Sequence, residues 1–206
     1  MRPRGFVPYR HDIRMSGEAD ARPVVGADRA VEIGLLAGLI RNERGRDVMR
    51  IANIDPQSDT ALSLLREAAV DVRPLYGEAP GPPWPHNLPL GPRDVYVAAF
   101  VGGTAIGCGA IRGLVASACE VHRMYVVRSH RRKGVARAIL SYLQAEAARL
   151  GYTRMRLETG NRQTPAIALY ESYGFSRVEP FGTYVNDPTS VCYELSVDEN
   201  RVVPTA

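Results

Sequence analysis

The segment 118–150 constrains the fold of this chain more than any other part of the sequence. Residues 118–127 have the character of a strand, and a basic, glycine-containing turn, 131–136, follows it. Apolar side chains then recur with the period of about 3.6 residues that is typical of an amphipathic helix. They occupy positions 136, 139, 140, 143, 147 and 150. A strand that passes into a helix with one apolar face predicts a helix packed on a sheet, and hence an α/β fold.

Turn and capping signals predict the other elements. Gly102-Gly103 predicts a tight hairpin turn between strands 94–101 and 104–111. Residues 77–92 are too rich in proline and glycine for regular structure, so a surface loop is expected there. The expected order of elements is β, α, hairpin, β, α, β, α, β, β. Its remaining strands are 49–54, 153–158, an extended segment that starts at Gly174-Phe175, and 190–197. Its remaining helices are 58–70 and 164–173, with a short additional helix at 27–40.

Three capping residues define the expected helix ends. Ser58 or Asp59 is expected to cap the helix that runs to Val70. Thr164 is expected to cap the last helix, with Pro165 at its first helical position. Gly151 is expected to end the amphipathic helix, because glycine adopts the left-handed conformation that such ends require.

Composition favours an ordinary globular protein. The 206 residues are 45% hydrophobic and 23% charged, with a net charge of +4, which allows one core and a modest tail. Three widely spaced cysteines, Cys108, Cys119 and Cys192, indicate neither a disulfide framework nor a metal site. No apolar run is long enough for a membrane span, so a cytoplasmic protein without membrane association is expected.

The first 47 residues differ from the rest of the chain. They are rich in arginine and poor in aromatic residues. The expected organisation is therefore an extension at 1–47, either a tail or an oligomer contact such as a homodimer interface, and one domain at 48–200.

The basic turn carries the first chemical signal. At a strand-to-helix junction, successive backbone N–H groups and the positive helix end can converge on one anion, such as a pyrophosphate. Gly134 and Ala136 keep the backbone accessible, and the surrounding side chains supply positive charge. The candidate anion-binding residues are Arg131, Arg132, Lys133, Gly134, Val135, Ala136 and Arg137. A solvated basic face, or a surface that contacts nucleic-acid phosphates nonspecifically, is the alternative.

Two motifs in order resemble the GNAT superfamily of N-acetyltransferases. The first is Arg-x-x-Gly-x-Ala at 131–136, after a strand that ends in Met124-Tyr125-Val126. The second contains Asn161, Ala166, Ala168, Leu169-Tyr170 and Gly174-Phe175. Leu157-Glu158-Thr159-Gly160 and Phe181-Gly182-x-Tyr184 further resemble a bacterial branch of uncharacterised acetyltransferases.

The resemblance implies a fold and a cofactor. The fold would be a mixed, mainly antiparallel twisted sheet of six to seven strands with about four helices. This sheet would be splayed between the strand ending at Val126 and the strand ending at Glu158. Acetyl-CoA would be the co-substrate and an amine the acceptor, with no metal and no specific nucleic acid.

The resemblance also implies residue roles. The backbone of Met124, Tyr125 and Val126 would bind the pantetheine arm and polarise the thioester carbonyl. The basic turn would hold the pyrophosphate, and Asn161 would contact the pantetheine or a bound water. Tyr170 would protonate the departing thiolate, although it is also typical of a core aromatic residue.

The base that accepts the amine proton has three candidates. Glu120 is the first, because it precedes Val126 at the spacing seen in histone-type members. In a regular strand it would share a face with His122 and Met124. Glu158 is the second and His122 the third, since histidine titrates near neutral pH. A catalytically silent acetyl-CoA-binding regulator with the same fold, and a basic nucleic-acid-binding module, are the alternatives to an enzyme. Nothing in the sequence identifies the acceptor.

Overall fold

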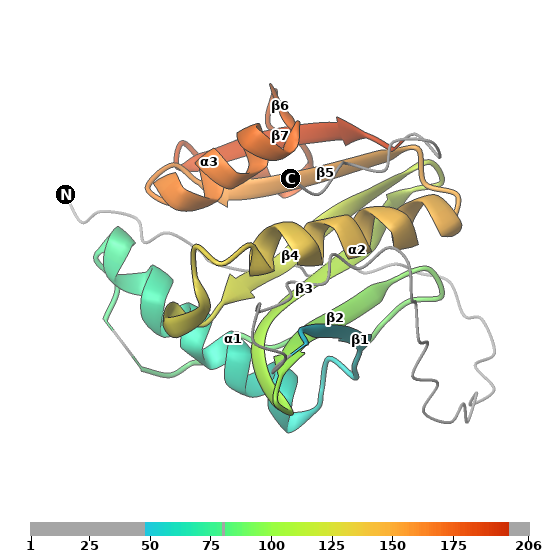
Figure 1. The fold of residues 1–206 in the computed structure, drawn as a ribbon. Coiled ribbons are helices and arrows are strands. Elements are labelled where there is room, and N and C mark those ends of the chain that lie inside the picture. Colours follow the sequence, from blue (N-terminus) through green and yellow to red (C-terminus); the bar gives the residue numbers. More distant parts are fainter. Residues whose placement is uncertain (1–47, 80, 198–206) are drawn as a thin grey trace. The chain divides into compact units, whose positions relative to one another are not determined.

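The structure is a computed structural model that describes residues 48–79 and 81–197. The extension 1–47, with its expected helix 27–40, lies outside these residues. The described chain contains seven strands, three α-helices and three short 3₁₀ helices (Figure 1). In chain order they are β1 (Arg50–Asn53), α1 (Asp59–Val72), η1 (Arg73–Tyr76), β2 (Val95–Val101), β3 (Thr104–Val115), β4 (Ala118–Val126), η2 (Arg128–His130), α2 (Val135–Arg149), β5 (Arg154–Gly160), α3 (Thr164–Tyr173), β6 (Ser176–Val178), η3 (Gly182–Tyr184) and β7 (Ser190–Ser196).

One sheet contains all seven strands, in the order β1-β2-β3-β4-β5-β7-β6. Every neighbouring pair is antiparallel except β4 and β5, which are parallel because α2 carries the chain back between them. The pairing of β4 with β5 extends from Ala118 and Arg154 only to Val121 and Leu157. Beyond that point the two strands diverge toward their carboxyl ends. The expected fold, including the splay beside Val126, is therefore confirmed.

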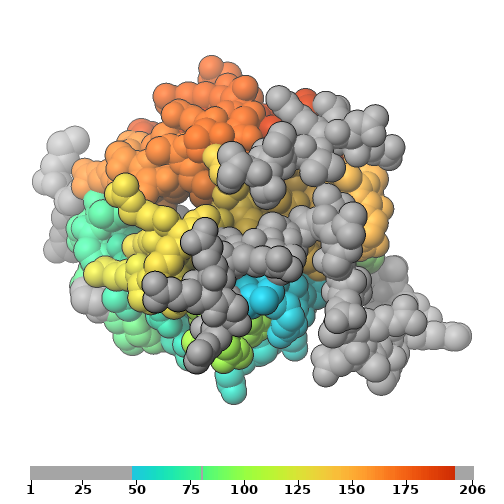
Figure 2. Space-filling model, viewed as in Figure 1, coloured from blue at the N-terminus to red at the C-terminus, as the bar shows by residue number. Residues whose placement is uncertain are grey.

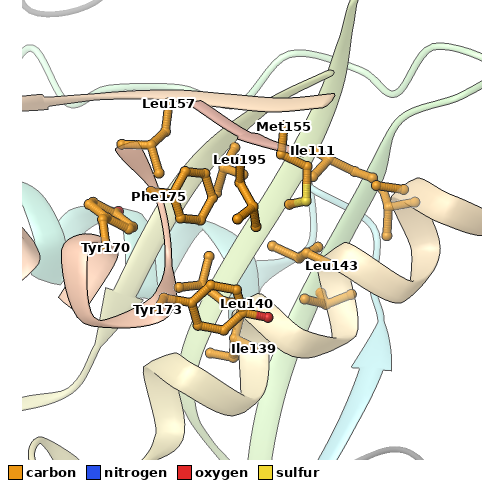
Figure 3. Close-up of a cluster of buried hydrophobic side chains, with 14 of the residues drawn as sticks. Ile111, Ile139, Leu140, Leu143, Met155, Leu157, Tyr170, Tyr173, Phe175 and Leu195 are labelled. Carbon is orange, nitrogen blue, oxygen red and sulfur yellow. The ribbon is translucent and has the colours of Figure 1, made fainter. Parts of the chain in front are cut away.

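The main core lies between the sheet and the helices α2 and α3 (Figure 3). Ile139, Leu140 and Leu143 of α2 are fully buried in it, against Met155 and Leu157 of β5. Each such side chain contributes about 1.5–3 kcal/mol by leaving water. A smaller cluster on the opposite face joins α1 to β2, β3 and Tyr125 of β4. The helices thus cover both faces of the sheet and leave the carboxyl ends of β4 and β5 between them.

Two of the expected caps are confirmed and one is wrong. The hydroxyl of Ser58 accepts a hydrogen bond from the backbone N–H of Ala61 at 3.3 Å, and Gly151 follows α2 with a φ of 78°. Thr164, however, is already the first residue of α3, and Gln163 stands at the cap without a side-chain hydrogen bond. Pro165 is thus the second helical residue and not the first, and because it has no backbone N–H it removes one of the donors that an N-cap side chain would bond.

A β-bulge interrupts β4. Cys108 of β3 pairs with Tyr125, but Ala110 pairs with His122, so two residues of β4 lie opposite Gly109. Arg123 has a φ of 58° at this point. Such a bulge reverses the alternation of the side chains that follow it. The expectation that Glu120 and Met124 share a face is therefore wrong: Met124 packs against the α2 side of the core, and Tyr125 takes the α1 side.

Candidate active site

The carboxyl half of β4 presents a backbone edge that β5 does not cover, because their pairing ends at Val121. The N–H of Val127 donates to the carbonyl of Ile106 on β3 at 3.0 Å. Since the N–H and C=O groups of one trans peptide point in opposite directions, the carbonyl of Val126 faces away from β3. It accepts a hydrogen bond from Nε of Arg131 at 2.8 Å. The N–H of Val126, which lies on the same side of the strand as its carbonyl, is thereby directed into the splay.

Residues 128–134, here called the basic loop, connect this edge to α2. After η2, Arg132 and Gly134 adopt positive φ values of 59° and 79°. Gly134 is the N-cap residue of α2, and the first backbone N–H groups of any helix lack an intrahelical acceptor. Arg132 and Lys133 are exposed, whereas Val135 is buried beneath them. In Figure 2 this part of the chain, coloured yellow, lies at the surface between the blue-green of α1 and the orange of the later elements, which include α3.

Two arginines of the predicted motif make contacts within the protein. Arg137 donates to the backbone carbonyl and the hydroxyl of Ser172, each at 3.1 Å, and so joins α2 to α3. Arg131 forms an ion pair with Asp71 of α1 in addition to its bond to Val126. The small side chain of Ala136 is half-buried against the main core. The loop therefore combines exposed cations with arginines that fix its shape.

Asp71 is a residue that the sequence did not single out. It accepts hydrogen bonds from Nε of Arg128 at 2.7 Å and from the hydroxyl of Tyr125 at 3.2 Å, besides its bond with Arg131. Its partners lie 54 to 60 residues away in the chain, so no local pattern marks the contact.

The two predicted glutamates lie near each other on adjacent strands. Glu120 is 3% exposed and accepts a hydrogen bond from the hydroxyl of Tyr184 at 2.7 Å. Nε2 of His122 lies 3.4 Å from the other carboxylate oxygen of Glu120. Glu158, on β5, accepts a hydrogen bond from the hydroxyl of Ser190 at 2.6 Å. All three candidate bases are thus brought together where β4 and β5 begin to separate.

The environment of Glu158 changes its acidity. Burial raises the pKa of its carboxyl to about 7, and the negative charges of Asp187 and Glu120 act in the same direction. The hydrogen bond from Ser190 opposes this rise without cancelling it. A carboxyl with a pKa near neutrality can take up and release a proton at physiological pH.

Asn161 lies in the turn after β5, and Tyr170 lies on α3, the helix that follows this turn. Asn161 directly follows this strand, its side chain is exposed, and its backbone N–H donates to the carbonyl of Thr189 at 2.7 Å. Tyr170, on α3, is 6% exposed. Its ring packs edge-on against Phe175 with the centroids 5.8 Å apart, and lies beside Tyr193. Asn161 thus lies at the carboxyl end of β5, whereas Tyr170 is a part of the core.

Tyr76 is a second residue that the sequence did not single out. Its ring lies over the end of β5, and its hydroxyl accepts a hydrogen bond from the backbone N–H of Arg162 at 3.3 Å. The guanidinium of Arg162 in turn donates to the carbonyl of Leu75 at 2.8 Å. The segment after α1 therefore reaches across to the strand that carries Glu158.

Comparison with known proteins agrees with this geometry. Residues 62–175 match the model of the acetyltransferase (GNAT) family. An uncharacterised N-acetyltransferase, YsnE of Bacillus subtilis (strain 168), is 43% identical over 103 residues, which are 49% of this chain and 68% of that protein. An IAA acetyltransferase of Azospirillum brasilense is 34% identical over 149 residues, which are 70% of this chain and 95% of that protein.

The chain is also similar to a solved structure. It is that of a provisionally named acyl-CoA N-acyltransferase from Klebsiella pneumoniae, with 30% identity and a TM-score of 0.61. The match covers 73% of this chain and 98% of that one. The chain therefore belongs to the acetyltransferase (GNAT) family and is an N-acetyltransferase. Among the helices in the described residues, none has the length and apolar character to cross a membrane.

Proposed function

We propose that this protein transfers the acetyl group of acetyl-CoA to a primary amine by direct attack in a ternary complex. The observation that carries the proposal is the divergence of β4 from β5 beside the basic loop at the start of α2. This arrangement offers a strand edge to an extended arm, and a helix N-terminus to phosphates, within one continuous path. A cofactor that joins a thioester arm to a pyrophosphate has that shape and charge.

The proposed cofactor contacts follow from the exposed groups of the loop. The N–H of Val126, and the backbone around Met124 and Tyr125, lie along the edge that the pantetheine arm would follow. Backbone amides at Gly134 to Ala136 would bind the pyrophosphate, assisted by the exposed cations of Arg132 and Lys133. Arg131 would support the loop rather than neutralise phosphate, because Asp71 and the carbonyl of Val126 already engage it.

The proposed proton transfers use groups at the splay. The amine nitrogen attacks the thioester carbonyl carbon, a C–N bond forms, the C–S bond breaks, and the amine loses a proton. Glu158 is the proposed base, ahead of Glu120, because its pKa of about 7 matches the working pH. Tyr170 is the proposed donor to the thiolate, and Asn161 the proposed contact to the pantetheine or a bound water.

Calorimetry with acetyl-CoA tests the cofactor assignment. Gly134→Glu places bulk and a negative charge against the pyrophosphate, so binding should fall by at least about tenfold. Gly103→Glu is the matched control. Gly103 has a φ of 80°, close to that of Gly134, and it lies in the hairpin turn between β2 and β3. Equal binding by the two variants would contradict the assignment.

A panel of amines tests the chemistry, with the release of free CoA as the measured quantity. Turnover with at least one primary amine is expected, and loss of turnover in Gly134→Glu should accompany it. Binding of acetyl-CoA without acetyl transfer to any amine would instead indicate a catalytically silent regulator.

A further inference from the structure

Asp71 connects the last turn of α1 to the basic loop through three partners. Its carboxylate receives Arg128 and Arg131 of the loop, and the hydroxyl of Tyr125 on β4. The ring of Tyr125 also lies under Arg131, with the guanidinium carbon 5.5 Å from its centroid. A single side chain thus fixes both ends of η2 to the strand from which the loop departs.

The carboxylate end of this contact is sheltered, whereas the side chains of Arg131 and Arg128 are 41% and 74% exposed. The side chain of Asp71 is only 12% exposed, and it lies in a groove of about 400 Å³ between α1 and η2. Burial alone would raise the pKa of Asp71, but the hydrogen bonds and charges of Arg128 and Arg131 outweigh it and lower the pKa. The carboxylate is therefore charged at neutral pH, and charge-assisted hydrogen bonds of this kind are about twice as strong as neutral ones.

The bond between Arg131 and Val126 extends this network to the splay. Arg131 donates through Nε to the carbonyl of Val126 and through its terminal nitrogen to Asp71. Because a guanidinium is planar, these two bonds fix the direction of the side chain and the position of the loop backbone behind it. Without Asp71, Arg131 would retain the carbonyl contact and its position over the ring of Tyr125 but lose its ion pair, and Arg128 would also lose its ion pair.

We infer that Asp71 is a positioning residue for acetyl-CoA, which holds the loop 128–134 in the conformation that binds the pyrophosphate. The inference rests on the proposed function. Asp71 does not touch the cofactor itself; it acts through Arg128 and Arg131. Its role is to keep the backbone amides at the start of α2 aligned, and to withhold Arg131 from the phosphates so that Arg132 and Lys133 meet them.

The test compares Asp71→Asn with Glu67→Gln, which removes a negative charge from the same groove. Asp71→Asn should raise the KM for acetyl-CoA by about tenfold, the size expected from losing a charge-assisted hydrogen bond, with little change in kcat. Asp71→Glu should restore part of the affinity, and Glu67→Gln should leave it unchanged. S-acetylpantetheine, which has no pyrophosphate, should be used equally well by all variants.

Three results would overturn the inference. The first is an equal KM in Asp71→Asn and Glu67→Gln. The second is an equal loss with S-acetylpantetheine, which would indicate general damage to the fold. The third is tighter binding of acetyl-CoA by Asp71→Asn, which would mean that the released arginines bind phosphate better than the ordered loop does.

Amide hydrogen exchange of the free protein separates this inference from the proposed function. Asp71→Asn should accelerate exchange in residues 128–134, and Glu67→Gln should not. If the wild-type protein failed to bind acetyl-CoA, the proposed cofactor would be wrong, and the exchange rates would still decide whether Asp71 orders the loop. Unchanged exchange in Asp71→Asn would contradict its positioning role.

Discussion

Gly160 lies directly beneath Tyr76: a Cβ atom at position 160 would be 1.7 Å from the hydroxyl oxygen of Tyr76. The contact joins the segment after α1 to the end of β5, next to Asn161. Any larger residue at this position therefore requires the tyrosine ring or the strand to move.

Gly160→Ala should lower the free energy of unfolding by about 1–3 kcal/mol, because the added methyl group forces the ring or the strand to move. Urea denaturation would measure the change. The same substitution in a Tyr76→Ala background should have little effect, since the clashing atoms are gone. Equal losses in both backgrounds would mean that a neighbour other than Tyr76, such as Gln163, opposes the larger residue.

Glu158→Gln should lower kcat by about 10²- to 10⁴-fold, the usual contribution of a general base. In the wild type, the active form of Glu158 is the carboxylate, so kcat/KM should rise with pH and level off above about 7. Glu158→Gln should lack this rise of kcat/KM with pH. Glu120→Gln should keep the rise but shift it to lower pH, because one of the negative charges that raise the pKa of Glu158 is removed.

Glu158 should also make stability depend on pH. Its folded pKa of about 7 lies above the ordinary 4.5, so the folded protein binds more protons than the unfolded chain between these values. Stability should therefore fall as pH rises through this window. Glu158→Gln should equal the wild type near pH 4 and exceed it by about 1–2 kcal/mol at pH 8, after allowance for solvent access. Denaturation at both pH values would check the sign.

Tyr170→Phe should lower kcat while leaving the dissociation constant for acetyl-CoA nearly unchanged. Tyr173→Phe is the matched control on the same helix. The hydroxyl of Tyr173 donates to Gln144 at 2.8 Å, so its loss should reduce stability by about 1 kcal/mol without reducing kcat. A Tyr170→Phe variant with the wild-type rate would remove Tyr170 from the acid role and leave it as a core residue.

Arg123→Gly should be more stable than Arg123→Ala, by about 1 kcal/mol, although glycine is normally the poorer residue in a strand. Both variants lose the same guanidinium, which donates to Asn87 and to the carbonyl of His86, each at 2.8 Å. They differ in the ease of adopting the φ of 58° at the bulge. Chemical denaturation of the pair would show whether the bulge persists when its side chain is lost.

Much of the fold follows from local signals in the sequence. The amphipathic period of α2, the Gly102-Gly103 turn and the Ser58 cap each act within a few residues, and each predicted its element within a few positions. The splay beside Val126 came from the resemblance to a family and not from any periodicity. The bulge at Arg123 was not predictable, because no glycine or proline marks it.

The candidate site was predictable in its residue types but not in its connections. Glu120, Glu158 and His122 were identified, and the structure brings them together. Asp71 and Tyr76 were missed because their partners are distant in the chain and come from other elements. The acidity of Glu158 depends on its burial and on Ser190, Asp187 and Glu120, which only the folded chain brings close to it.

The early end of the pairing between β4 and β5 gives this sheet a third edge, inside the protein rather than at its rim. Unpaired strand edges recruit other strands, which is a common route to aggregation. If the pantetheine arm covers this edge as proposed, bound cofactor blocks the edge from pairing with another strand. We therefore expect the cofactor-free protein to self-associate on heating or storage, and saturating acetyl-CoA to suppress this self-association.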